Sequence, residues 1–160
     1  MKSLRLLLVI LLYNTCLLAQ TPNLQYDKRL ADSLGSDEYG MKSYVFVILK
    51  TGSYQPADKQ LLDSLFRGHM DNINRLADMN KLVVAGPMAK NDKNYRGIFI
   101  LNVKTTEEAQ ELLDTDPTIK NHIFEVELYG WYGSAALPMY LKTHDRIAKP
   151  KKTLDQRPFT

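Results

Sequence analysis

The sequence predicts a single α+β domain with the βαββαβ order of a ferredoxin-like fold. The chain has 160 residues, of which 44% are apolar and 24% are charged, a globular composition at a length that suits one domain. Short β-branched and apolar runs alternate with two amphipathic helical patterns. Two crossovers of one hand would place both helices on the same face of an antiparallel sheet. We therefore expect four strands covered by helices on one side only.

The first strand carries the strongest signal. Residues 43–50 read SYVFVILK, which is apolar on both faces, so both faces of this strand should be covered. The helices can cover only one of them. A sheet of this kind usually pairs its second face with another copy of the chain, and the sequence therefore predicts a homodimer.

The remaining elements follow in order. A long helix should open at Pro56 and run to about Met79. The sequence Thr105-Thr106-Glu107-Glu108 matches a capping box and should start a second helix that ends near Asp114. Apolar runs predict the other three strands, the first of which is broken by Gly86 and Pro87. These strands are expected at 81–85, 96–103 and 123–131.

The amino terminus has the pattern of an export signal. Lys2 and Arg5 precede a wholly apolar run from Leu6 to Leu12, and Ala19 offers a small residue for cleavage. The run is shorter than the roughly 20 residues of a membrane-spanning helix, so residues 1–19 are expected to be removed, leaving an exported, periplasmic or secreted protein without a stable membrane span. Processing as a lipoprotein at Cys16 is the alternative, although the residues before Cys16 lack the usual small side chains.

The mature chain is close to neutral. Without residues 1–19, the remaining 19 basic and 18 acidic side chains leave a net charge of +1. Electrostatics therefore supplies no argument for binding nucleic acid. Cleavage after Ala19 or Gln20 also removes Cys16, the one cysteine, and with it any thiol chemistry.

Two segments flank the expected domain at 41–131. The lead-in segment 20–40 contains a short helical pattern that stops at Gly35. The segment 132–160 is interrupted by glycine and prolines, and its last twenty residues hold six basic side chains. We interpret it as a basic C-terminal tail. The alternative is a tail that folds over the partner or gates a cleft.

Few residues of the sequence are candidates for catalysis or for binding a metal or cofactor. None of the three histidines has a companion at the spacing that builds a metal site on a helix, and there is no glycine-rich phosphate loop and no nucleophile motif. We therefore expect no metal and no cofactor. His69 stands out because it lies within the apolar stripe of the long helix and should point at the sheet. A buried neutral imidazole needs a partner for its N–H, and a carboxylate is the natural one.

Helix geometry offers Asp116 as that partner. His69 lies ten residues, or ~15 Å, before the end of the first helix, and Asp116 lies eleven residues, or ~16 Å, after the start of the second. In antiparallel neighbouring helices the two residues fall at one height, with axes ~8–10 Å apart. Both residues also have a simpler interpretation: a lone helical histidine is often a satisfied core residue, and Asp116-Pro117 is common turn chemistry.

The sequence contains an ordered set of short motifs: His69, 80–82, 85–88, 95–97, 105–109 and 115–117. Together these motifs resemble the YciI-like family, also called the YCII-related domain. The resemblance covers about residues 41–131, and the lead-in is similar to that of an exported branch with signal peptides. It implies a dimeric α+β barrel with the family's His-Asp dyad at His69 and Asp116. A dehydrochlorinase of chlorinated hydroxyquinol is the relative with a known activity, and Asn80 departs from the family where a glycine is common.

Two functions of different class follow. In the first, the chain is an enzyme: Asp116 orients His69, which acts as general acid and base in elimination or isomerisation of a small carbonyl or phenolic compound. Gly86 and Pro87 would shape the pocket wall, and Arg96 would hold an anionic group of the substrate. In the second, the domain binds a small ligand without catalysis, and the dyad is a buried structural pair. Access of solvent to His69 distinguishes the two, because a sealed interior favours the second.

Overall fold

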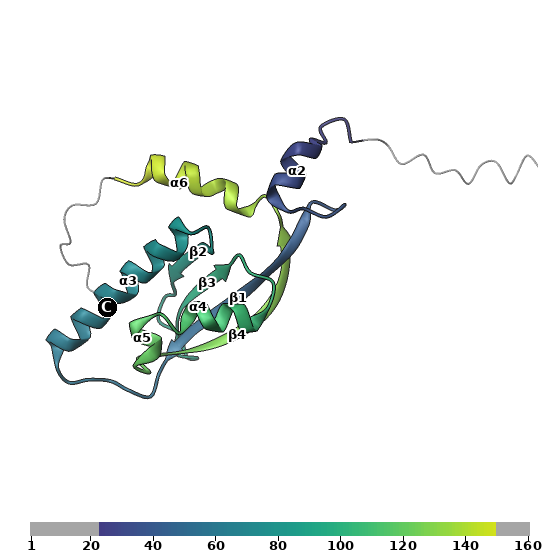
Figure 1. The fold of residues 1–160 in the computed structure, drawn as a ribbon. Coiled ribbons are helices and arrows are strands. Elements are labelled where there is room, and N and C mark those ends of the chain that lie inside the picture. Colours follow the sequence, from purple (N-terminus) through teal and green to yellow (C-terminus); the bar gives the residue numbers. More distant parts are fainter. Residues whose placement is uncertain (1–22, 150–160) are drawn as a thin grey trace, which may run out of the picture.

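The structure is a computed structural model that describes residues 23–149 (Figure 1). The predicted export signal at 1–19 and the end of the predicted tail, 150–160, lie outside the described residues. Within the described part of the chain, no helix is both long enough and apolar enough to cross a membrane.

The predicted α+β fold is confirmed. Four strands form one sheet in the order β2-β3-β1-β4, and each neighbouring pair is antiparallel. Helix α3 connects β1 to β2, and α4 and α5 connect β3 to β4, which is the βαββαβ order. The bounds are β1 Met41–Thr51, α3 Lys59–Asp78, β2 Leu82–Pro87, β3 Tyr95–Leu101, α4 Thr106–Leu113, α5 Pro117–Lys120 and β4 Phe124–Ser134.

Side-chain acceptors decide where the helices begin. The α3 helix starts three residues after Pro56, because the Asp58 carboxylate accepts hydrogen bonds from two amides of the first turn. Thr105 caps α4 as the capping box predicts, and its hydroxyl accepts from the Glu108 amide at 3.2 Å. Glu108 reaches back to the Lys104 amide at 3.1 Å.

Two strands run further than the sequence predicts. Strand β2 is not broken at Gly86 and continues to Pro87, because β2 is an edge strand, where proline is tolerated without a ladder partner on its outer side. Strand β4 continues beyond Trp131 to Ser134, because its last residues pair with the start of β1 at Met41. Residues 132–134, which were expected to begin the C-terminal tail, therefore belong to the sheet.

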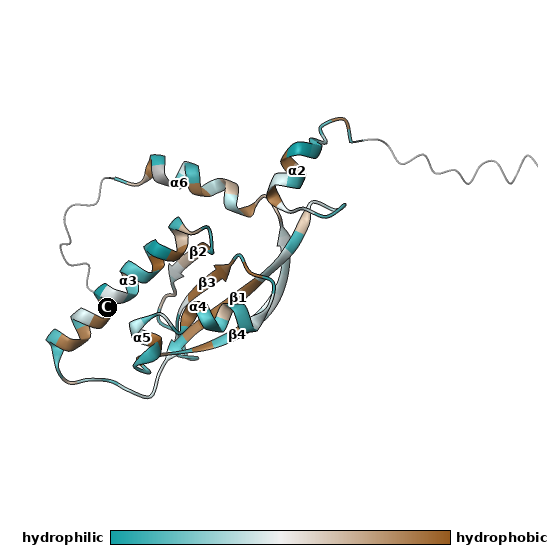
Figure 2. Ribbon diagram, viewed as in Figure 1, coloured by the Kyte–Doolittle hydropathy of each residue, from teal (hydrophilic) through white to brown (hydrophobic). Residues whose placement is uncertain are grey.

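The two faces of the sheet differ. One face is covered by α3, α4 and α5 and forms the core, to which Val45, Val47 and Leu49 of β1 contribute. The intervening residues of β1 lie on the other face, where Phe46 pairs with Ile100 and Ile48 with Ile98. We call this second set the uncovered face. It comprises Phe46, Ile48, Val84, Ile98 and Ile100, all half-buried. Figure 2 shows β1 and β3 as strongly hydrophobic.

The flanking segments are partly folded. The lead-in contains α2, Lys28–Leu34, which ends at Gly35 in the left-handed conformation with φ 67°, as predicted. After β4, the chain forms a short 3₁₀ helix, Leu137–Tyr140, and α6, Leu141–Ile147. The Tyr140 hydroxyl donates to the Val83 carbonyl of β2. The predicted tail therefore begins with ordered structure that reaches the opposite edge strand.

Candidate functional site

Helix α3 positions the histidine. Its buried residues are His69, Asn72 and Leu76, which are spaced three and four residues apart and so lie on the face that packs against the sheet. Met70, an apolar residue next to His69 in the chain, is exposed. One buried helix face thus carries two polar side chains side by side.

Asp116 is positioned by the start of α5. It is the N-cap of this helix, with Pro117 at the first helical position. Its Oδ1 accepts from the Thr118 amide at 2.9 Å and from the Thr118 hydroxyl at 2.6 Å. The interpretation of Asp116-Pro117 as turn chemistry is therefore correct, but it involves only one of the two carboxylate oxygens.

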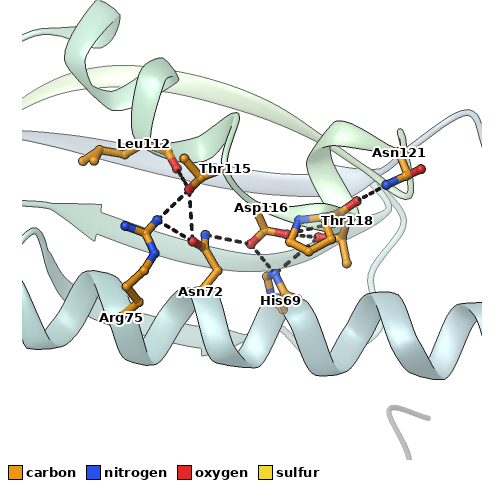
Figure 3. Close-up of polar contacts among 9 residues, drawn as sticks. His69, Asn72, Arg75, Leu112, Thr115, Asp116, Thr118 and Asn121 are labelled. Carbon is orange, nitrogen blue, oxygen red and sulfur yellow. Dashed lines mark hydrogen bonds and ion pairs between the residues drawn. The ribbon is translucent and has the colours of Figure 1, made fainter.

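The second oxygen meets the histidine, as helix geometry predicts (Figure 3). His69 Nδ1 lies 2.7 Å from Asp116 Oδ2, and Asn72 Nδ2 donates to the same oxygen at 3.3 Å. Asp116 is completely buried and His69 is 6% exposed. Four donors converge on one carboxylate, which is the environment of an ionised acid.

The pKa of Asp116 reflects opposing causes. Burial alone would raise it, but the hydrogen bond and charge of His69 and the hydrogen bonds from the Thr118 hydroxyl and amide outweigh burial and hold the pKa of Asp116 below its ordinary value. Because an ionised carboxylate only accepts hydrogen bonds, His69 carries a proton on Nδ1. In the neutral ring, Nε2 then holds the lone pair.

The environment of Nε2 is aromatic and not fully closed. The ring of Phe99 stacks on the imidazole at a centroid distance of 6.0 Å, and Phe66 and Phe124 approach edge-on. Nε2 has no hydrogen bond to any described residue, yet within 23–149 no fully buried side-chain nitrogen lacks a partner. Nε2 therefore keeps a small exposure to solvent.

The network extends beyond the dyad. Arg75 Nη2 donates to Asn72 Oδ1 and lies equally close to the Thr115 hydroxyl, both at 2.7 Å. This contact fixes the Asn72 amide with its NH₂ group toward Asp116. Sequence reasoning missed Asn72, Arg75, Thr115 and Thr118. The available signal was spacing: Asn72 and Arg75 follow His69 by one and two helical turns, and Thr118 stands two residues after a predicted cap.

The predicted substrate residues lie together, but on another part of the sheet. Pro87 pairs with Gly97, and the Met88 amide donates to the Arg96 carbonyl at 2.9 Å. Gly86 pairs with Ile98 and so belongs to the uncovered face, opposite to His69. Arg96 is exposed. Among residues 23–149, no hydrogen bond joins these three to the dyad.

Two of the surface depressions lie away from the dyad. One, of about 470 Å³, is lined by α4 and Leu128. Another of about 470 Å³ is lined by the end of α2, the start of β1 and the segment from Asn102 to Lys104. Neither includes His69 or Asp116. In the described part of the chain, no three His, Cys, Asp or Glu side chains are grouped so that they could hold a metal ion.

Fold and site together define the class of protein: a ferredoxin-like α+β domain with a buried His-Asp pair between helix and sheet. The model of the YCII-related domain matches residues 45–131. This match covers more than half of the chain, and the chain belongs to that family.

One solved structure is similar to the chain at low identity: 5-chloro-2-hydroxyhydroquinone dehydrochlorinase (TftG) from Burkholderia phenoliruptrix AC1100, in complex with 2,5-dihydroxybenzoquinone. The two are 21% identical, with a TM-score of 0.39, and the match covers 54% of this chain and 92% of that chain. No curated protein matches the sequence.

Proposed function

We propose that the domain is a small-molecule enzyme in which His69 acts as general acid and base and Asp116 orients it. One observation carries the proposal: Nδ1 is tied to a buried carboxylate while Nε2 has no partner among the described residues and stays in contact with solvent. An imidazole held in this way has its lone pair on the nitrogen that a substrate can reach.

The chemistry that suits this arrangement is proton transfer at carbon or at a phenolic oxygen. Nε2 takes the proton from a carbon next to a carbonyl group, and the electron pair of that C–H bond forms a new double bond. In an elimination, the leaving group departs with its own electron pair. In an isomerisation, the imidazolium returns the proton at another carbon. Asp116 stabilises the imidazolium that forms in between.

Access to Nε2 is expected at the edge strand. Ala85 of β2 pairs with Phe99, the residue that stacks on His69, and so lies on the helix side of the sheet. Ala85 is nevertheless exposed, which means that the helical layer is open beside it. A substrate entering here would pass the end of the β2–β3 hairpin. Arg96 and Pro87 lie at that end of the hairpin, and Arg96 is a candidate to hold an anionic group of the substrate. Gly86 faces the other side of the sheet and does not line this path.

The alternative function is a non-catalytic domain that binds a small ligand or uses the dyad as a structural pair. The near-complete burial of His69 favours it. A screen separates the two functions. Small aromatic and carbonyl compounds are tested for an increase in Tm of the wild type and of His69→Gln, and each hit is then tested for conversion.

A compound that stabilises the wild type and is converted, and that is not converted by His69→Gln, supports the enzyme. A compound that stabilises both proteins and is never converted supports a binding domain. Stabilisation by no compound, together with loss of folding in His69→Gln, supports a structural pair and contradicts the catalytic proposal.

We also propose that the chain forms a homodimer through the uncovered face, as a dimeric α+β barrel. The support is that five apolar side chains on this face remain half-buried, while helices α3, α4 and α5 pack on the other side. Apolar patches of this kind commonly mark protein interfaces. Sedimentation of the wild type and of Phe46→Glu tests this proposal.

Finally, we propose that the protein is exported, on the pattern of residues 1–19, and that it belongs to the exported branch of the family. Intact mass spectrometry of protein from its native host should show that residues 1–19 are absent. A mass that retains Met1, or one that fits a lipidated Cys16, contradicts this proposal.

A further inference from the structure

The Thr118 hydroxyl occupies a special position beside the dyad. It is completely buried and lies 2.6 Å from Asp116 Oδ1 and 3.3 Å from His69 Nδ1. Among the described residues, it is therefore the one side chain that lies within hydrogen-bonding distance of both members of the pair (Figure 3).

The donor and acceptor roles of these atoms follow from counting hydrogens. A threonine hydroxyl has one hydrogen, and the shorter contact, to the ionised Asp116, takes it. The hydroxyl oxygen can then only accept toward His69 Nδ1. Nδ1 thus faces two acceptors, Asp116 Oδ2 and Thr118 Oγ1, and no donor.

The same hydroxyl also helps to fix the orientation of the Asp116 carboxylate. Together with the Thr118 amide it occupies Oδ1, while His69 and Asn72 occupy Oδ2. Each oxygen accepts two hydrogen bonds, so rotation of the carboxylate would break several at once. The negative charge is shared between both oxygens and is not concentrated on the one that faces His69.

We propose that Thr118 is a positioning residue of the dyad: its hydroxyl orients Asp116 and holds part of the carboxylate charge on Oδ1, and so sets the strength of the hydrogen bond from His69 Nδ1 to Oδ2. This inference deepens the proposed function and rests on it. Asn72 and Arg75 support the other carboxylate oxygen but do not touch His69 through any hydrogen bond in the described chain.

Thr118→Val tests the proposal, because valine has nearly the same shape and lacks the hydroxyl. Thr118→Ser restores the hydroxyl, and Thr106→Val removes a hydroxyl that bonds only to Glu107. The readout is the NMR signal of the Nδ1 proton in protein labelled with ¹⁵N at histidine. Asp116→Asn identifies this signal, since it replaces the carboxylate acceptor.

Without the hydroxyl, charge concentrates on Oδ2 and the bond from Nδ1 strengthens. The Nδ1 proton signal of Thr118→Val should therefore move downfield, while Thr118→Ser and Thr106→Val keep the wild-type position. The Tm of Thr118→Val should fall by about 3–6 °C at pH 7. If Thr118→Val does not fold, Thr118→Ala serves in its place.

An unchanged Nδ1 signal in Thr118→Val with a lower Tm overturns the proposal and leaves Thr118 as a helix cap. A Thr118→Ser protein that behaves like Thr118→Val overturns it as well. Because the signal needs no substrate, failure of this proposal is distinguishable from failure of the proposed enzyme activity, which is measured by conversion.

Discussion

The two faces of the sheet each contain a close pair of one basic and one acidic side chain, and the two pairs differ in almost everything except distance. On the helix side, His69 and Asp116 are 2.7 Å apart with side chains 7% and 0% exposed. On the uncovered face, Lys50 and Glu127 are 2.9 Å apart and about one third exposed, at 34% and 30%. Separation alone does not distinguish them.

Burial makes the difference. A buried carboxylate needs several hydrogen bonds to offset the loss of water, and Asp116 has further ones from Asn72 and Thr118. Lys50 and Glu127 remain hydrated, and salt screens them. A dense, fully satisfied cluster in a small domain is costly to keep for stability alone. This contrast supports the acid-base role that we propose for the helix side.

Changes in the dyad should have the largest effect. His69→Gln and Asp116→Asn should each lower turnover about 10²–10⁴-fold, because each removes the acid-base group or its orientation. The double variant should be little worse than the worse single one, since the two residues act as a unit. Rates of the three variants on a substrate from the screen measure this.

Stability measured on the same variants is the control. A purely structural pair predicts coupled losses of about 1–3 kcal/mol in the free energy of unfolding, without a specific loss of activity. Fully additive rate losses, or destabilised variants that keep full activity, contradict the catalytic role of His69.

A charge on the uncovered face should have the next largest effect. The wild type is expected to sediment at about twice the monomer mass at micromolar concentration. Phe46→Glu should give a monomer, because an unpaired carboxylate at the centre of an apolar interface is strongly unfavourable. Leu61→Glu, at an exposed position of α3, is the control and should stay dimeric. A monomeric wild type, or a dimeric Phe46→Glu, contradicts the proposed dimeric barrel.

Lowering the pH should have a smaller effect, which is a loss of unfolding free energy that depends on Asp116. The pKa of Asp116 is lower in the folded protein than in the unfolded chain. Its stabilisation is therefore complete above the unfolded value of about 3.9 and disappears as the pH falls through the lower folded value. Between pH 5 and the acid limit of folding, the wild type should lose more unfolding free energy than Asp116→Asn. Parallel curves from urea denaturation would contradict this.

The exposed pair should have the smallest effect. Lys50→Met removes a hydrogen bond and a charge that together lower the pKa of Glu127, but solvent replaces both. The melting temperature of the monomeric Phe46→Glu background should not change measurably on adding Lys50→Met. A clear loss there would mean that the exposed pair matters for the fold and would weaken the contrast between the faces.

Local patterns predict a great deal of this molecule. The caps at Thr105 and Gly35 and the apolar runs of β1 and β3 are decided by residues within a few positions of one another, so they are visible in the sequence. The contact between His69 and Asp116 was also expected, from helix rise and the βαββαβ order. The expectation placed Asp116 at the end of the second helix, whereas α4 ends at Leu113 and Asp116 caps α5, which packs against α3.

The tertiary structure alone decided which side chains complete the site and which face others occupy. Irregularities in the ladders, between Leu82 and Val84 and between Leu49 and Lys50, change which face the following residues take, because side chains alternate with a period of two. Gly86 thus lies on the side of the sheet opposite to His69. The sequence gives only the position of Gly86 along the chain and does not show this. Asn72 and Thr118 are ordinary polar residues in the sequence and become part of the dyad only because α3 and α5 bring them to one carboxylate.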